Sequence, residues 1–196
     1  MTTIVLVRHA ATAWSGWRYS GQGDPPLSAV GRRSAGTLAS RLASTLPPGV
    51  RIVASPSRRA YETAALLATR MAPIVLETDA RWIEADLGDV EGLTFDEIAA
   101  RYPDLAQRLA GGAVDIDWPA GETAAALHAR VAAAWWEIVA ADRPTVVVSH
   151  GGPIRIAVAL ATGRATVEVP LPGPAEAVVL EVGIADPTGL GPRSAP

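Results

Sequence analysis

The stretch Thr145-Val-Val-Val-Ser-His-Gly-Gly-Pro153 carries two signals that together decide the fold. Residues 145–148 form a short β-branched run of the kind that is buried on both faces of a sheet. Pro153 suits the first turn of a helix, so we expect a helix to follow this strand directly. A buried strand followed at once by a helix predicts an α/β domain with a mainly parallel sheet.

The rest of the chain repeats this alternation of strand and helix. Further short apolar runs, which predict strands, occupy residues 4–7, 52–54, 74–76 and 177–182. Ala- and Leu-rich stretches with helical spacing, which predict helices, occupy residues 31–45, 59–71, 95–109 and 122–140. Trp135 and Trp136 lie in the last of these helices, where we expect both to pack against the core.

Length and composition favour one soluble domain. The chain has 196 residues, of which 49% are hydrophobic, and this suffices to fill a single core. We expect one domain over residues 1–185 and a disordered tail over residues 186–196, which are rich in Gly, Pro and Ser. Residues 1–7 lack the basic region of a signal peptide, and no stretch reaches the length of a membrane span. We therefore expect a cytoplasmic protein.

Cysteine content and charge exclude several function classes. The chain has no cysteine, which excludes disulfides, thiolate catalysis and cysteine-bound zinc. Its net charge is −3 and no run of like charges occurs, which argues against nucleic acid or a membrane surface as a partner. A homodimer is the default expectation for assembly, because dimers are the commonest form among soluble oligomers.

Polar side chains follow three of the predicted strands. They are Arg8 and His9 after residues 4–7, Ser55, Arg58 and Arg59 after residues 52–54, and Ser149 to Gly152 after residues 145–148. In open α/β sheets ligands bind beyond the carboxyl ends of the strands, so these groups converge on one pocket if the strands are neighbours. Arginines beside two imidazoles suit a tetrahedral dianion, because guanidinium binds phosphate oxygens in bidentate fashion.

Each of these groups alone also has an ordinary structural explanation. A Ser-His-Gly-Gly sequence is typical of a turn, and two arginines at a helix start are typical of a solvated surface. The coincidence at three strand ends favours a binding site. His128 is the contrasting case, because it lies within a predicted helix and follows no strand; we expect it at or near the surface.

Several segments, taken in order, resemble the motifs of the histidine phosphatase superfamily, also called the phosphoglycerate mutase-like family. They are Leu6-Val-Arg-His-Ala-Ala-Thr12, Arg18-Tyr-Ser-Gly21 with Asp24-Pro-Pro-Leu-Ser28, Ser55-Pro-Ser-Arg-Arg-Ala-Tyr-Glu-Thr-Ala64, Glu84-Ala-Asp-Leu-Gly88 with Glu91-Gly92, Pro119-Ala-Gly-Glu-Thr123 and Val148-Ser-His-Gly-Gly152. Each match alone is weak, but the ordered set is specific. The resemblance implies a three-layer α/β/α sandwich with a mainly parallel sheet.

The resemblance also implies roles for individual side chains. His9 is the implied nucleophile and Glu84 the implied proton donor. The implied phosphate pocket consists of Arg8, Arg59 and His150, with Thr12 and the backbone N–H of Gly151 as secondary contacts. The Arg-Ala-x-Glu-Thr-Ala pattern selects Arg59 rather than the adjacent Arg58. Many members of the family have Asn where this chain has Ser15, which we expect to be a weaker phosphate contact.

The chemistry of these groups leads to a functional expectation. His9 must present an unprotonated nitrogen to phosphorus, so its other nitrogen should donate to a backbone carbonyl. Arginines can stabilise the charge on the transferred phosphoryl group, so we expect no metal and no cofactor. The expected activity is that of a phosphomonoesterase, which hydrolyses a small organic phosphate ester through a phosphohistidine intermediate.

Two alternative functions stay open, namely a phosphoglycerate mutase-type phosphotransferase and a phospho-ligand binding protein without turnover. Residues 93–121 are expected to lie over the site, with Tyr102 and Trp118 as candidate substrate contacts. This segment has two arginines against five acidic residues, a balance that disfavours a mutase, which must retain a bisphosphorylated intermediate. The substrate stays open between α-ribazole phosphate, a sugar phosphate, a nucleotide and other monoesters.

Overall fold

A five-stranded mixed sheet forms the centre of the computed structural model, which describes residues 1–71 and 75–183. The strands are β1 (Thr2–Arg8), β2 (Arg51–Ala54), β3 (Leu76–Thr78), β4 (Thr145–Ser149) and β5 (Ala177–Val182), in the spatial order β3-β2-β4-β1-β5. All neighbouring pairs are parallel except β1 and β5, so the expected mainly parallel sheet is confirmed.

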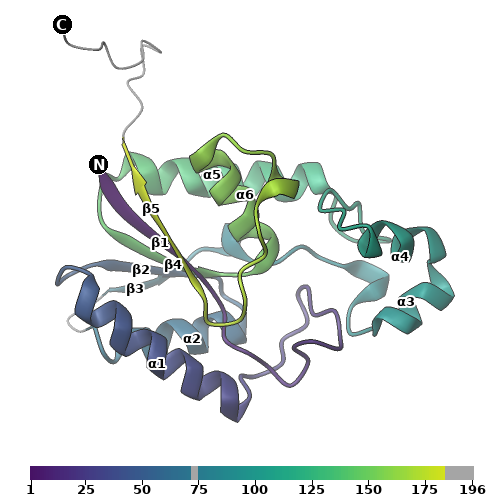
Figure 1. Ribbon diagram of the computed structural model, residues 1–196, viewed down its shortest axis with the longest axis horizontal. Coiled ribbons are helices and arrows are strands. Elements are labelled where there is room, and N and C mark those ends of the chain that lie inside the picture. Colours follow the sequence, from purple (N-terminus) through teal and green to yellow (C-terminus); the bar gives the residue numbers. More distant parts are fainter. Residues whose placement is uncertain (72–74, 184–196) are drawn as a thin grey trace, which may run out of the picture.

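Helices cover both faces of the sheet, which confirms the three-layer sandwich (Figure 1). One face carries α1 (Ala29–Thr45) and α2 (Arg58–Ala68), and the other carries α5 (Ala124–Ala140) and α6 (Gly151–Thr162). β1 divides its side chains between these layers with the two-residue period of a strand. Val5 and Val7 pack with α1 and α2, whereas Ile4 and Leu6 pack with α5 and α6. Burying each such aliphatic side chain contributes about 1.5–3 kcal/mol.

The helix predicted over residues 95–109 is wrong in one respect, because the structure divides it into α3 (Phe95–Arg101) and α4 (Pro103–Ala110). The break lies at Tyr102, whose φ of −135° is outside the helical range. Pro103 causes it, since proline disfavours the helical conformation of the preceding residue and lacks a backbone N–H. The two short helices lie beyond one end of the sheet (Figure 1).

Other sequence-based expectations have mixed outcomes. Pro153 lies in the first turn of α6, as predicted. Trp135 is fully buried, but Trp136 is 49% exposed, so the expectation that both pack against the core is wrong for Trp136. The strand predicted over residues 74–76 begins outside the described residues, and β3 starts at Leu76. The tail over residues 186–196 lies wholly outside them. No helix among the described residues is long and apolar enough to cross a membrane.

The sheet order brings three strand ends together. β4 lies between β1 and β2 and is parallel to both, with Arg8 beside Ser149 and Ala54 beside Val148. The segments that follow these strands therefore leave the sheet at the same edge. Three 3₁₀ helices, η1 (Ala80–Trp82), η2 (Gly88–Val90) and η3 (Thr166–Glu168), lie in the connecting segments.

The start of α1 packs closely against the backbone of Ala11 near this edge of the sheet. The side chain of Ser28 accepts a hydrogen bond from the N–H of Gly31, and the N–H of Ser28 donates to the carbonyl of Ala11. A Cβ on Gly31 would lie 2.0 Å from the Ala11 oxygen, whereas a Cβ on Gly36 in the same helix would meet nothing within 4 Å.

We expect Gly31→Ala to destabilise the protein by about 1–3 kcal/mol, because the new methyl group overlaps a backbone oxygen. Gly36→Ala is the matched control and should stabilise it by about 0.5–1 kcal/mol, since alanine favours a helix interior. Urea unfolding midpoints of the two variants measure the difference. Equal stability of Gly31→Ala and the unmodified protein would contradict the packing described for this helix start.

Candidate active site

A cavity of about 530 Å³ opens at the edge of the sheet where β1, β2 and β4 end. Four of the predicted site residues line it, namely Arg8, His9, Arg59 and Glu84. They come from the end of β1, the first turn of α2 and the segment between η1 and η2. The structure therefore brings together residues that are far apart in the sequence.

His9 lies at the end of β1 with its ring fixed in one tautomer. Its Nδ1 is 2.9 Å from the carbonyl oxygen of Ala10, and because a carbonyl can only accept, Nδ1 carries the proton. This confirms the expected backbone partner. The other nitrogen, Nε2, accepts from Nε of Arg59 at 3.3 Å. Burial, with the positive charge of Arg59 as the next cause, lowers the pKa of His9 to about 3.

Arg59 contacts both histidines of the site. Its Nη2 is 3.0 Å from Nδ1 of His150, in addition to the contact with His9. The guanidinium is also held by backbone carbonyls, at 2.6 Å from Gly21 and 2.6 Å from Gly23. The side chain is 1% exposed, whereas Arg58 is exposed and pairs with Glu62. The structure places Arg59, and not Arg58, at the cavity.

His150 lies behind Arg59, fully buried, and does not itself line the cavity. Because its Nδ1 accepts from Arg59, its Nε2 carries the proton and donates to Oγ of Ser55 at 2.8 Å. Oγ of Ser57 is also within 3.1 Å of Nε2. Burial lowers the pKa of His150 well below its ordinary value, and the charge of Arg59 adds to this effect. His150 is therefore neutral.

Arg8 faces the same cavity with an incomplete set of partners. Its Nη1 donates to the carbonyl of Pro172 at 2.8 Å, but its Nε is buried without a partner among the described residues. An unsatisfied buried donor on a cation is costly unless an anion binds to it. Burial lowers the pKa of Arg8 and of Arg59, and the negative charge of Glu84 partly opposes this shift.

Glu84 lines the cavity and lies beside the start of α6. Its Oε2 accepts from the N–H of Gly152 at 3.3 Å and its Oε1 from the N–H of Ala85 at 3.1 Å. These two backbone N–H groups fix the position of the carboxyl group at the cavity. The site thus contains one carboxyl group, two guanidinium groups and two neutral imidazoles.

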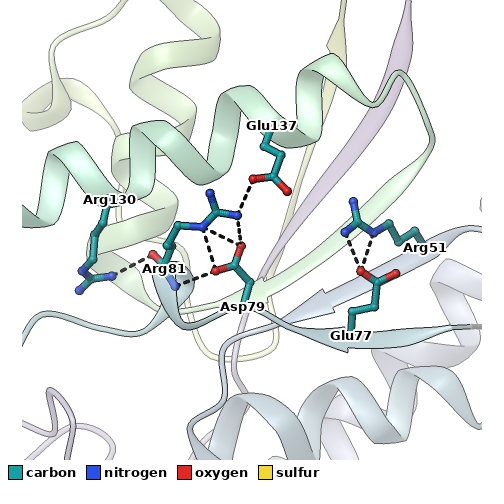
Figure 2. A network of polar contacts seen from close by, with 6 residues as sticks. All are labelled: Arg51, Glu77, Asp79, Arg81, Arg130 and Glu137. Carbon is teal, nitrogen blue, oxygen red and sulfur yellow. Dashed lines mark hydrogen bonds and ion pairs between the residues drawn. The ribbon is translucent and has the colours of Figure 1, made fainter.

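The backbone that carries Glu84 is held by Arg130 of α5, which the sequence analysis did not single out. Arg130 donates to the carbonyls of Arg81, Ile83 and Glu84, and pairs with Glu122 at 2.7 Å. The motif Pro119–Thr123 contains this acidic partner and was the available signal. Figure 2 shows Arg130 beside η1, where Arg81 is itself held between two carboxylates.

Glu91 holds the loop that orients Arg59. Its carboxylate accepts from the N–H groups of Gln22, Gly23 and Leu87 at 2.6, 3.1 and 3.2 Å. A Cβ on Gly21 would lie within 2.4 Å of both Leu87 and Glu91, so only glycine fits between these segments. Glu91 belongs to a motif that is visible in the sequence, but its role could not be predicted, because its partners are backbone groups.

The remaining predicted contacts lie off the cavity lining. Oγ1 of Thr12 accepts from the N–H of Trp14 at 3.1 Å, and Oγ of Ser15 accepts from the N–H of Thr12 at 2.9 Å. Gly151 is buried at the start of α6. The phosphate contacts predicted for Thr12, Ser15 and Gly151 stay predictions. His128 is exposed on α5, as expected. Within residues 1–71 and 75–183, no cluster of three or more His, Asp or Glu could hold a metal ion.

Comparison with known proteins gives a family for this arrangement. The model of the histidine phosphatase superfamily (branch 1) matches residues 4–186. A solved structure of a mycobacterial glucosyl-3-phosphoglycerate phosphatase in complex with VO3 has a TM-score of 0.81 and 32% identity to this chain. The match covers 92% of this chain and 91% of that one.

Two curated relatives from Mycobacterium tuberculosis differ in length. Glucosyl-3-phosphoglycerate phosphatase is 38% identical over 164 residues, which are 77% of this chain and 71% of that protein. A bifunctional protein is 38% identical over 165 residues, which are 82% of this chain but only 44% of that protein. The match to the family model over nearly the whole chain, together with the shared fold, shows that this chain belongs to the histidine phosphatase superfamily.

Proposed function

We propose that the protein is a phosphomonoesterase, which hydrolyses a small organic phosphate ester through a phosphohistidine at His9. The observation that carries this proposal is the unprotonated Nε2 of His9 at the cavity, beside Arg8 and Arg59, neither of which has an anionic hydrogen-bond partner among the described residues. A neutral imidazole is a nucleophile, and guanidinium groups stabilise the oxygens of a transferring phosphoryl group. The relatives named as phosphatases support the same activity.

In the first step, Nε2 of His9 attacks phosphorus, so that a P–N bond forms while the P–O bond to the alcohol breaks. Protonated Glu84 gives its proton to the departing oxygen, which would otherwise leave as a strong base. Arg8 and Arg59 bind the phosphoryl oxygens throughout. His150 keeps Arg59 in place through the hydrogen bond to its Nδ1. These groups carry out the transfer without a metal ion.

In the second step, water attacks the phosphohistidine from the side that the alcohol has left. Glu84, now a carboxylate, takes a proton from the water. The P–N bond breaks and its electron pair returns to Nε2 of His9. Inorganic phosphate leaves, and Glu84 is again protonated for the next cycle. The presence of Glu84 and His9 on the lining of the same cavity supports this double use.

Residues 1–185 are proposed to form one domain that acts in the cytoplasm as a homodimer. The domain proposal is supported by the one sheet found among the described residues, which separates two core clusters and takes its strands from nearly the whole matched range. The location rests on the amino-acid composition, and the dimer on the frequency of such assemblies.

Replacement of the nucleophile tests the intermediate. We expect the unmodified protein to form an acid-labile, base-stable phosphoryl label from a phosphate ester in EDTA. His9→Ala should lose the label and at least about 10³-fold in kcat, because neither His128 nor His150 lines the cavity and could replace it in forming the P–N bond. His128→Ala is the control and should match the unmodified protein, since this side chain is exposed and does not line the cavity. Normal turnover by His9→Ala would exclude the mechanism.

Leaving-group dependence tests the proton donor. Glu84→Gln should slow the hydrolysis of alkyl phosphates by about 10²–10⁴-fold, because alkoxides need a proton to leave. The loss for p-nitrophenyl phosphate should be much smaller in the transfer step, since nitrophenolate leaves without help. Asp86→Asn is the control, because Asp86 accepts from the N–H of Gly88 and does not line the cavity. An unchanged rate on alkyl phosphates in Glu84→Gln would assign the proton transfer to another carboxylate.

The two neutral histidines give a pH test. In the folded protein the pKa values of His9 and His150 lie below the ordinary 6.5. Below pH 6.5 the unfolded chain therefore binds protons that the folded protein does not, and the free energy of unfolding falls as the pH is lowered from 7 to 5. The slope approaches about 1.4 kcal/mol per pH unit for each such histidine.

Urea unfolding at pH 7 and pH 5 measures this slope. His9→Asn and His150→Asn should each reduce it, whatever their effect on stability at pH 7. His128→Asn should leave it unchanged, since the side chain is exposed. An equal slope in all four proteins would mean that the buried imidazoles bind protons in the folded state.

A further inference from the structure

Residues 93–121 form one wall of the cavity, as expected, and the wall is entirely apolar. The side chains from this segment that line the cavity are Phe95, Leu109, Ala113, Val114, Ile116 and Trp118. None of the seven charged residues of the segment lines it, and neither does Tyr102, whose hydroxyl donates to Asp89 instead. The excess of acidic residues in segment 93–121 therefore does not make the cavity surface acidic.

Strand-like alternation separates the two kinds of side chain at the end of this segment. Val114, Ile116 and Trp118 line the cavity, whereas Asp115 and Asp117 are exposed. Asp115 lies 3.6 Å from Arg108, and Asp117 accepts from a backbone N–H at the start of α5. The acidic groups are thus engaged away from the cavity, and the apolar ones face the site of His9.

The mouth of the cavity also carries exposed apolar side chains. Trp17, Phe95 and Leu171 are 52%, 41% and 53% exposed, and all three line the same cavity. They come from three segments that are distant in sequence. Exposed apolar side chains that gather around one concave site mark a surface that an apolar ligand covers.

The charged residues farther from His9 have other partners. Arg18 donates to the carbonyl of Gly92, lies 3.6 Å from Glu97 and stacks over the ring of Trp17 at 4.1 Å. Arg155 directs its Nε to the carbonyl of Val169 at 2.9 Å. The uncharged polar side chains on the lining are Tyr19, Ser20 and Thr166. Apart from the groups around His9 and these two arginines, which also line the cavity, the lining therefore offers a carboxylate or several hydroxyls only these three hydroxyl groups.

We propose that the alcohol part of the substrate is a flat apolar or aromatic group, joined to the phosphate through a short chain. This inference rests on the proposed phosphomonoesterase activity. The phosphate binds at His9, Arg8 and Arg59, and the apolar group packs between Phe95 and the wall formed by Ile116 and Trp118. Monoesters that carry a carboxylate or many hydroxyls lose the hydration of these groups on entering and are poor substrates.

Matched alkyl esters test the proposal. We expect kcat/KM for 3-phenylpropyl phosphate to exceed that for propyl phosphate by about 10- to 100-fold, because the phenyl ring leaves water in the complex. O-Phosphoserine and 3-phosphoglycerate should fall below 3-phenylpropyl phosphate by at least the same factor. If either of these two charged esters is the better substrate, the proposal is wrong although the protein is still a phosphatase. Absence of turnover with every ester and with p-nitrophenyl phosphate contradicts the proposed function itself.

A pair of aromatic variants locates the effect. Phe95→Ala should lower kcat/KM for 3-phenylpropyl phosphate about 10-fold more than for propyl phosphate, mainly through KM. Trp136→Ala removes an aromatic side chain of similar exposure that does not line the cavity, and it should change neither value. An equal effect of Phe95→Ala on both esters overturns the placement of the apolar group against this wall.

Discussion

The hydrogen bonds of the buried Arg59 guanidinium are the interaction on which the rest of the site depends. One cation, 1% exposed, contacts both imidazoles and two backbone carbonyls. Because a protonated imidazole could not accept from it, this arrangement requires both histidines to be neutral. Glu91 and Gly21 support the same geometry. The carboxylate of Glu91 holds the loop whose carbonyls bind the guanidinium, and the lack of a side chain at Gly21 lets this loop approach closely.

The cavity combines charged groups around His9 with an apolar wall from residues 93–121. The apolar wall strengthens the electrostatic interactions of the charged groups. Apolar walls exclude water, and electrostatic interactions are stronger where water is excluded. In the proposed reaction Arg8 and Arg59 therefore act on a phosphoryl group in surroundings that screen their charges little. The same walls raise the cost of binding a substrate with additional charges. The proposed affinity for phosphate and the proposed selectivity for the alcohol thus have one structural origin.

The sequence predicted those features that depend on side-chain type at a strand end. His9 and His150 could be located because buried β-branched runs precede them. Arg59 rather than Arg58, and Glu84 rather than its acidic neighbours, were selected through the family resemblance. The roles of Arg130 and Glu91 could not be predicted, since both bind backbone groups of distant segments. Motifs in the sequence contain Glu91 and the partner of Arg130, Glu122, but they do not show these contacts. The break at Pro103 was readable from proline chemistry alone. The exposure of Trp136 could not be predicted, because helical spacing does not show how wide the buried face of α5 is.

The strand order has a consequence for how the protein is made. β4 separates β1 from β2 in the sheet, yet it follows α5 in the chain. During synthesis β1 and β2 are made before β4, the strand that pairs with both. Until β4 is made, their edges toward it stay unpaired and the apolar side chains of the sheet stay exposed. Such edges are prone to intermolecular pairing, and late long-range closure is slow. Nascent chains that stop before β4 therefore expose these strand edges, and the site is assembled only when the last inner strand is inserted, because His150 follows that strand.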